Sequence, residues 1–283
     1  MEAFQSIDFG KAIVIDNGSF KIKSGFAGDL TPKLITPTSC AREYELAMLA
    51  ANIRSGVVVD CGDDSTRVLP VYNGRPITEA FVTEEISGKD ITEYLAYLIE
   101  SENGSYFDQP IITDIKEKVG YVATDYNNEL RLSNSFPFSY EISEDELLSL
   151  GSTRVRCPEP LFQPRLINKK SLGVHTATFK SINMCKPDIQ SSLYENILLV
   201  GGSTLFPGFS QRLYKELSIL APVNTKIRII DPPTRQLLAW LGGSMAANEA
   251  KFTCNVVSKK EYEEYGTSII NQRFISSTGT RRI

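Results

Sequence analysis

Short apolar runs that end in glycine, serine or aspartate recur along this 283-residue chain. Three of them lie at residues 12–15, 56–59 and 197–200, and each is rich in valine, isoleucine or leucine. Apolar runs of this length, bounded by turn residues, predict buried strands. A second strand-like stretch follows each of the first two runs, and a helical pattern follows the third. We therefore expect two hairpins and one strand–helix unit.

Helical periodicity dominates most of the remaining chain. From Gly88 onward, one helical face carries Ile91, Tyr94, Leu95, Tyr97 and Leu98. Further helices are predicted over residues 42–52, 108–119, 143–150, 171–183, 188–194, 207–218 and 235–249, and further strands over 119–123 and 227–230. Residues 30–41 and 151–170 contain prolines and are predicted as connections. Strands that alternate with helices are typical of the α/β class.

Composition and charge narrow the classes of function. A hydrophobic content of 42% suffices for a core, and a net charge of −4 provides no basic field for nucleic acid. No run is long enough to span a bilayer, and the start Met1-Glu2-Ala3-Phe4, which carries an acidic residue, does not resemble a signal peptide. The five cysteines lack metal-ligand spacing, and a single histidine, His175, removes most histidine-based schemes. We expect a reduced, intracellular protein that binds neither nucleic acid nor membrane.

The ends of the three predicted strands carry the candidate chemistry. They read Asp16-Asn17-Gly18-Ser19, Asp60-Cys61-Gly62-Asp63 and Gly201-Gly202-Ser203-Thr204. Glycine and serine after a buried strand leave backbone N–H groups open to an anion. Two such hairpin tips that face each other can bind the phosphates of a nucleotide. We therefore predict an ATP clamp in which the third segment closes over the sugar and base.

Each of these motifs also has a plainer interpretation. Asn-Gly is a common hairpin turn, and Lys23, which could neutralise a phosphate at the first turn, could equally be a solvated lysine. Asp60 and Asp63 could orient water around Mg²⁺ or form a polar turn. Gly201 and Gly202 either let a ligand touch the backbone or permit close packing of a strand against a helix.

The chain resembles actin and the actin-related proteins over residues 11–33 and from about 54 to 274. Besides the three strand ends, the matching stretches are GKDITEYL at 88–95, RCPEPLFQP at 156–164, WLGGS at 240–244 and SKKEYEEYG at 258–266. The resemblance implies an α/β, actin-like (ribonuclease-H-like) ATPase fold, in which two similar halves enclose a nucleotide cleft.

The resemblance also implies the residues of a nucleotide site. The cofactor would be ATP or ADP with Mg²⁺, or with Ca²⁺ in its place. The residues implied to contact it are Asp16, Asn17, Gly18, Ser19, Lys23, Asp60, Gly62, Asp63, Lys116, Glu117, Gly201, Gly202 and Ser203. Asp16 and Asp63 would reach the metal through water. The catalytic residue stays unassigned.

Compared with the family, most of the first half is expected to be missing. Residues 1–53 would be its remnant, with the first phosphate hairpin and one helix. Residues 54–237 would form a complete second half, with an inner part (54–87 and 170–237) and an outer part (88–169), and residues 238–283 would return to the first half. The missing block, about a hundred residues, includes the outer loop that clasps a neighbour in filaments. It also leads to the glutamine that positions the attacking water.

Several retained positions also depart from the family pattern. Phe20, Arg67, Thr113 and Gln236 stand where the family has glycine, histidine, arginine and lysine. Phosphoryl transfer depends on positioning, so loss of the water-orienting residue should reduce the rate more than the affinity. Two lysines interrupt the apolar plug at 166–173, which weakens its burial against a partner. We therefore do not expect ordinary filament self-assembly.

Three functions remain open at this point. The first is a structural subunit of a cytoskeletal or other multi-subunit assembly that binds other actin-like subunits and Mg-ATP with weak or no hydrolysis. Such a subunit would act in the cytoplasm, on the cytoskeleton, or in the nucleus. The second is an active ATPase of the wider sugar-kinase and chaperone superfamily. The third is a nucleotide-free interaction module or a partial, non-functional gene product.

Overall fold

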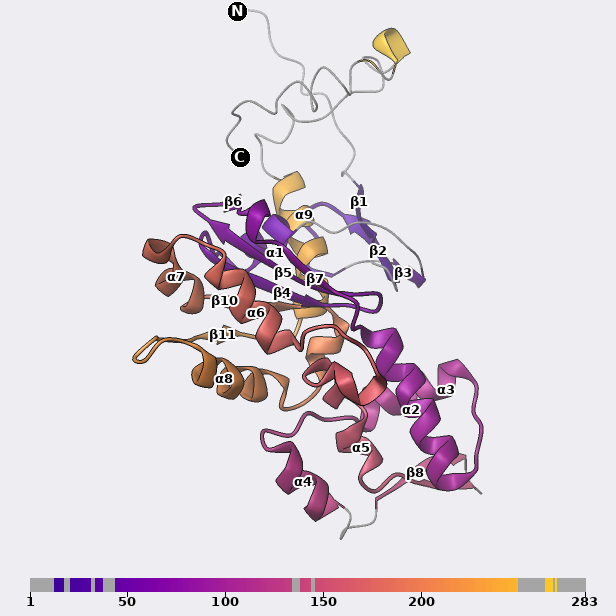
Figure 1. Cartoon of the computed structure of the whole chain (residues 1–283). Coiled ribbons are helices and arrows are strands. Elements are labelled where there is room, and N and C mark those ends of the chain that lie inside the picture. Colours follow the sequence, from indigo (N-terminus) through magenta and orange to yellow (C-terminus); the bar gives the residue numbers. More distant parts are fainter. Residues whose placement is uncertain are drawn as a thin grey trace, which may run out of the picture.

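Figure 1 shows the computed structural model of the chain, in which helices cover both faces of a central sheet. The structure describes residues 13–17, 21–31, 34–37, 44–133, 138–143, 146–248, 263–266 and 268. Within these residues, a helical lobe follows the sheet and a small second sheet lies beside helix α9 (Leu238–Asn248).

The central sheet is built on the second predicted hairpin. Strands β4 (Gly56–Cys61) and β5 (Thr66–Tyr72) pair antiparallel, and β10 (Ile197–Val200) joins β4 in parallel. The other strands are β6 (Arg75–Pro76), β7 (Val82–Glu84) and β11 (Ile229–Ile230). Across the described residues, the strand order is β11-β10-β4-β5-β6, and β7 also pairs with β5. Every residue of β4 and β10 is buried, as expected for strands with helices on both faces.

Alternate residues of β4 enter two different cores. Val57 and Val59 face the larger core, which helices α6 (Val174–Asn183), α7 (Pro187–Tyr194) and α8 (Phe209–Leu220) complete. Val58 faces a smaller core, together with α1 (Tyr44–Ala50) and the first turn of α9. Successive side chains of a strand point to opposite faces. The sheet is therefore the middle layer of an α/β/α arrangement (Figure 1).

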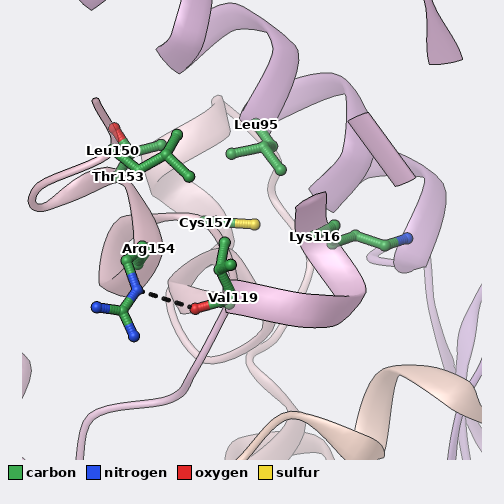
Figure 2. Close-up of a pocket in the computed structure, with 8 residues that line it drawn as sticks. Leu95, Lys116, Val119, Leu150, Thr153, Arg154 and Cys157 are labelled. Atoms are coloured by element: carbon green, nitrogen blue, oxygen red, sulfur yellow. Dashed lines mark hydrogen bonds between the residues drawn. The ribbon is translucent and has the colours of Figure 1, made fainter. Parts of the chain in front are cut away.

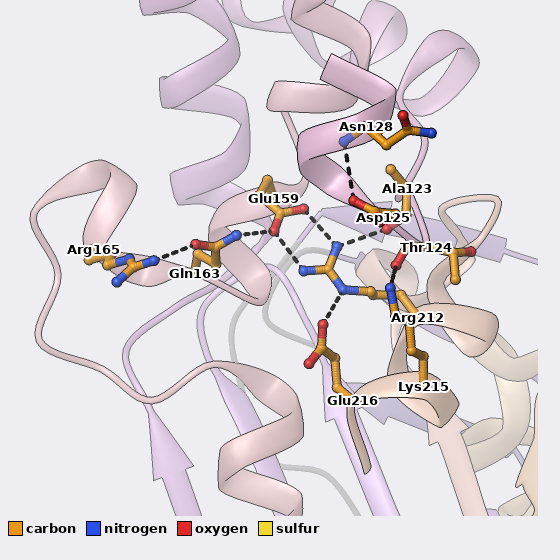
Figure 3. Close-up of polar contacts among 10 residues, drawn as sticks. All are labelled: Ala123, Thr124, Asp125, Asn128, Glu159, Gln163, Arg165, Arg212, Lys215 and Glu216. Carbon is orange, nitrogen blue, oxygen red and sulfur yellow. Dashed lines mark hydrogen bonds and ion pairs between the residues drawn. The ribbon is translucent and has the colours of Figure 1, made fainter. Parts of the chain in front are cut away.

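The lobe that follows the sheet is mainly helical. It contains α2 (Gly88–Asn103), α3 (Gln109–Val119), α4 (Tyr126–Ser133) and α5 (Thr153–Arg156), with the hairpin β8 (Ser139–Ser143) and β9 (Glu146–Ser149). A buried ion pair ties the lobe to α8 (Figure 3). The Arg212 guanidinium donates to both carboxylate oxygens of Glu159, at 3.0 and 3.2 Å, and also to the Ala123 carbonyl at 2.8 Å. Breaking such a pair by removing one partner would leave the other charge buried and unpaired.

The first predicted hairpin belongs to the small sheet. Strands β1 (Ile13–Asn17) and β2 (Lys21–Phe26) pair antiparallel as expected, but β3 (Leu34–Pro37) extends the sheet where we predicted a connection. The prediction of a connection was wrong because the prolines in 30–41 do not exclude a strand. Pro37 is the last residue of β3, a strand that pairs on one side only among the described residues, and proline is tolerated on such edge strands.

Other local predictions were also wrong. Residues 120–123 form no strand, because the amides of Tyr121 and Val122 bond to two separate segments, at Arg154 and Pro207. The predicted helix 143–150 is instead part of the β8–β9 hairpin, and α4 was not predicted at all. On α2, Tyr97 points to solvent, whereas Thr92 and Ile99 join the buried face. In each of these segments, contacts with distant parts of the chain determine the local structure against the preference of the local sequence.

Helix α9 connects the small sheet to the central one. It packs against β1, β2 and α1. At the crossing with α1, a side-chain carbon added to Gly242 would lie 1.8 Å from the carbonyl oxygen of Leu46. Two residues later, the Ser244 hydroxyl accepts from the Gly28 amide at 2.9 Å and donates to the Asp29 carbonyl at 3.0 Å. At position 242, only glycine allows α9 and α1 to approach this closely.

We expect Gly242→Ala to destabilise the protein. Alanine favours a helix over glycine by about 0.5–1 kcal/mol, but the added carbon forces α9 away from α1, at a cost of about 1–3 kcal/mol. Urea denaturation followed by circular dichroism should show a lower midpoint. A midpoint equal to or above that of the wild type would show that the close approach is not required.

The chain's only histidine should make stability depend on pH. His175 stacks on Phe162 with 5.9 Å between ring centroids, and its Nδ1 atom is buried without a hydrogen bond to any described residue. Burial lowers the pKa of His175, against the opposing charge of Glu216. Below about pH 6.5 the unfolded chain therefore binds the proton more readily.

The free energy of unfolding should therefore fall as the pH is lowered from 7 to 5.5. His175→Gln should flatten this dependence, because glutamine does not titrate. Any loss of packing in this variant shifts the free energy of unfolding equally at every pH. Denaturation midpoints measured across this range test the expectation. An unchanged slope in the variant would assign the pH dependence to other groups.

Candidate functional site

The structure places the second predicted phosphate loop at the tip of the β4–β5 hairpin. Asp60 is fully buried at the end of β4. In the turn, the Gly62 amide donates to the Ser65 carbonyl at 3.1 Å. The amides of Asp64 and Ser65 donate to no carbonyl of the described residues. Two backbone donors are thus open at the tip, as an anion-binding turn requires.

The carbonyl oxygen of Gly62 joins three separate segments. It accepts a hydrogen bond from the Gly88 amide at 2.8 Å and from the Ser203 hydroxyl at 3.2 Å. The next carbonyl, of Asp63, accepts from the Lys89 amide at 3.0 Å. The hairpin tip, the start of α2 and the turn after β10 therefore meet at one point.

The two glycines after β10 have different roles. Gly201 has a φ of +89°, and a side-chain carbon there would lie 2.3 Å from the Cys61 carbonyl and 2.5 Å from Oδ1 of Asp60. Close packing therefore accounts for Gly201. Gly202 is exposed, and an added carbon would meet nothing within 4 Å. Of the two interpretations left open by the sequence, packing fits the first glycine and ligand access fits the second.

Lys116 reaches the same point from α3. Its ammonium donates to the Gly88 carbonyl at 3.2 Å and to Oγ1 of Thr92 at 2.7 Å, and the residue is buried. Figure 2 shows its stem beside a narrow apolar gap, with the nitrogen pointing away from Cys157. The gap has no room for a water molecule. Glu117, the next residue, is exposed on α3.

The first predicted phosphate loop is described only in part. Asp16 and Asn17 end β1, and Asp16 lies directly opposite Lys23 of β2 in the strand register. Gly18 and Ser19, like Phe20, lie outside the described residues. The structure therefore brings Asp60, Gly62, Asp63, Lys116, Gly201, Gly202 and Ser203 together, whereas the first loop remains a prediction.

Two further residues of the site were not predicted. Gly88 stands between Gly62 and Lys116, and a side chain on it would clash with the Ser203 hydroxyl, 2.7 Å away. Arg235 clamps the turn after β10, donating to Oγ1 and the carbonyl of Thr204 at 3.0 and 2.9 Å. Glycine at a helix start was a usable signal for the first. No local pattern indicated the second, because its partner lies 31 residues away.

A second hollow lies beside β7. It is an open cleft of about 600 Å³ lined by residues 83–85 and 168–171. Lys169 crosses it, pairing with Asp90 at 2.7 Å and donating to the Glu85 carbonyl. The segment that resembles an apolar plug is therefore held against its own chain.

The described residues include no group of three or more histidine, cysteine, aspartate and glutamate side chains placed to hold a metal. Magnesium in nucleotide sites is commonly held by one or two carboxylates with phosphate and water. Asp63, half-buried at the hairpin tip, fits that role. No helix in the described part of the chain combines the length and apolar character needed to cross a bilayer.

These features define an α/β protein with a candidate ligand site outside the carboxyl ends of adjacent parallel strands, where such folds bind ligands. A sequence model of the actin family matches residues 45–275. Actin-29 of Dictyostelium discoideum is 35% identical over 244 residues, which cover 82% of this chain and 63% of that protein. The chain belongs to the actin family and spans less than two thirds of that relative's length. The predicted actin-like α/β fold is confirmed.

The two neighbouring glycines should respond differently to one added methyl group. Gly201→Ala combines a positive φ with two close contacts, so we expect a loss of stability of about 2–4 kcal/mol. Gly202→Ala should change the free energy of unfolding by less than about 0.5 kcal/mol. Chemical denaturation of both variants without nucleotide tests this. Equal effects would contradict the assignment of packing to the first position alone.

Proposed function

We propose that this chain binds ATP or ADP with Mg²⁺ and acts as a structural subunit of a multi-subunit assembly, with weak or no hydrolysis. The observation that carries the proposal is the meeting of the hairpin tip, α2 and the turn after β10 at the Gly62 carbonyl. These three segments lie far apart in the sequence, and two of them contain predicted nucleotide contacts.

The geometry supports a nucleotide laid across the strand ends. Ser203 and Gly202, with Lys116 behind them, would contact the nucleoside on the β10 side. The open amides of Asp64 and Ser65 would bind phosphate at the hairpin tip. Asp63 would hold Mg²⁺ through water, and Asp16 of β1, which is paired in register with Lys23 of β2, would be the second such carboxylate. The metal would neutralise phosphate charge, which the aspartates alone would repel.

Weak hydrolysis follows from the expected deletion. The residue that orients water in the family belongs near the expected missing block. A bound nucleotide would therefore stabilise the fold more than it would drive a cycle. This supports a structural role in place of an efficient ATPase.

The state of the plug segment supports a role outside ordinary filaments. Lys169 is paired with Asp90, so extending the segment toward a neighbour would break an ion pair. Family membership favours other actin-like subunits or a larger complex as partners, in the cytoplasm, on the cytoskeleton or in the nucleus. Nothing in the proposal requires contact with nucleic acid or membrane.

One observation favours a nucleotide-free interaction module instead. The Lys116 ammonium and the Ser203 hydroxyl both bond to main-chain carbonyls of the chain itself. The junction can therefore stand as a structural core without any ligand. A partial gene product with the same fold would share this property.

Mg-ATP at a hundredfold excess over its Kd should raise the melting temperature by about 5–10 °C. Asp63→Ala should reduce the shift obtained with Mg²⁺ and leave the shift obtained in EDTA unchanged. Asp64→Ala is the matched control, because Asp64 is an exposed carboxylate in the same turn. This variant should keep the full thermal shift obtained with Mg²⁺. Thermal-shift assays with each variant give the measurement.

Phosphate release measured on the same samples should be far slower than binding. No shift at millimolar Mg-ATP would reject nucleotide binding and favour the nucleotide-free module. Rapid turnover would reject the structural role and point to an active ATPase.

A further inference from the structure

Three polar side chains lie in one row across one face of the central sheet, at the end where the candidate site lies. Asp60, Arg67 and Thr83 occupy neighbouring positions on β4, β5 and β7. On β10 the row continues with Val200, which belongs to the smaller core. Two residues back along the strands, Leu198, Val58 and Leu69 form an apolar row that belongs to the core beneath α1. Residues two apart share a face. Arg67 therefore points to the same side as α1, just beyond the apolar core.

Arg67 has no partner among the described residues. It is half-buried, yet no described carboxylate lies within ion-pair distance and no described acceptor bonds to its guanidinium. Asp60 stands directly opposite it on β4, where an opposite charge commonly pairs across strands. Oδ1 of Asp60 instead lies against the backbone of Gly201, on the β10 side. The guanidinium thus keeps its five donors for another acceptor.

Arg67 is also the one cation of the hairpin. Residues 56–72 contain three carboxylates, Asp60, Asp63 and Asp64, and no lysine or arginine other than Arg67. A polyphosphate that reached the turn amides would meet these acids first. A planar guanidinium, which binds phosphate oxygens with two parallel hydrogen bonds, offsets that repulsion.

The order of strands gives the guanidinium a position along the ligand. The candidate nucleoside contacts lie after β10, and the turn amides follow β4. Arg67 lies one strand further, on β5. In a nucleotide laid across these strand ends, the terminal phosphate is the group furthest from the base. It would therefore lie nearest to Arg67.

We propose that Arg67 binds the terminal phosphate of a nucleoside triphosphate and makes this site select a triphosphate over a diphosphate. The inference rests on the proposed nucleotide binding, and it adds a residue that discriminates between two nucleotides. The interaction is charge-assisted and depends on one residue. Its loss should weaken the binding of ATP about tenfold and that of ADP by less than about twofold.

Isothermal titration with Mg-ATP and with Mg-ADP tests the proposal on the full chain. The wild type should bind ATP more tightly than ADP, and Arg67→Gln should abolish the difference. Arg67→Lys keeps the charge but loses the bidentate fork, so it should retain part of the preference. Arg75→Gln is the matched control, because Arg75 is exposed on β6 at the other end of β5. It should behave as the wild type.

The outcomes separate the two proposals. If the wild type binds nucleotide but Arg67→Gln lowers both affinities equally, or neither, the role of Arg67 is rejected and nucleotide binding stands. If the wild type binds neither nucleotide, the proposed function fails and the selectivity fails with it. Circular dichroism reports whether each variant folds. If Arg67→Gln does not fold, an Arg67→Lys variant with an unchanged ATP-to-ADP ratio rejects the proposal.

Discussion

The structure of the candidate site depends on one carbonyl group, that of Gly62. A carbonyl oxygen has two lone pairs, and here both are used, by the Gly88 amide and the Ser203 hydroxyl. Gly88 in turn presents its own carbonyl to the Lys116 ammonium. Segments from the sheet, the lobe and the turn after β10 are thus fixed relative to one another before any ligand arrives. Such preorganisation reduces the ordering cost of binding.

This arrangement requires a rigid base, which the two cores supply. β4 contributes Val57 and Val59 to one core and Val58 to the other, and all three are fully buried. A shift of one residue in the pairing of β4 would exchange the two sets of side chains. The register of the sheet is therefore strongly specified, and with it the row that holds Asp60 and Arg67. The polar residues of the site owe their positions to the apolar residues two steps behind them.

The sequence predicted the parts of the fold that local pattern determines. Apolar runs beside Gly62 and Gly201 identified the central strands, and periodicity identified α2, α6, α8 and α9. The helical pattern over residues 143–150 gave a wrong prediction, because burial of Leu148 in the larger core stabilises the β8–β9 hairpin there. For the site, Asp60, Gly62, Lys116 and Ser203 were expected, and the structure brings them together. The separate roles of Gly201 and Gly202 depend on which backbone lies opposite, and no sequence pattern carries that information.

The connection between the two sheets follows from the same packing. α1 rests on the face of the central sheet that carries Arg67, and α9 presses Gly242 against α1 while Ser244 binds the segment after β2. The first hairpin is therefore connected to the central sheet through α9 and its crossing with α1. That crossing leaves no space for a side-chain carbon at Gly242, so a larger residue there would force α9 away from α1. The position of the first hairpin relative to the central sheet therefore depends on this backbone contact at Gly242.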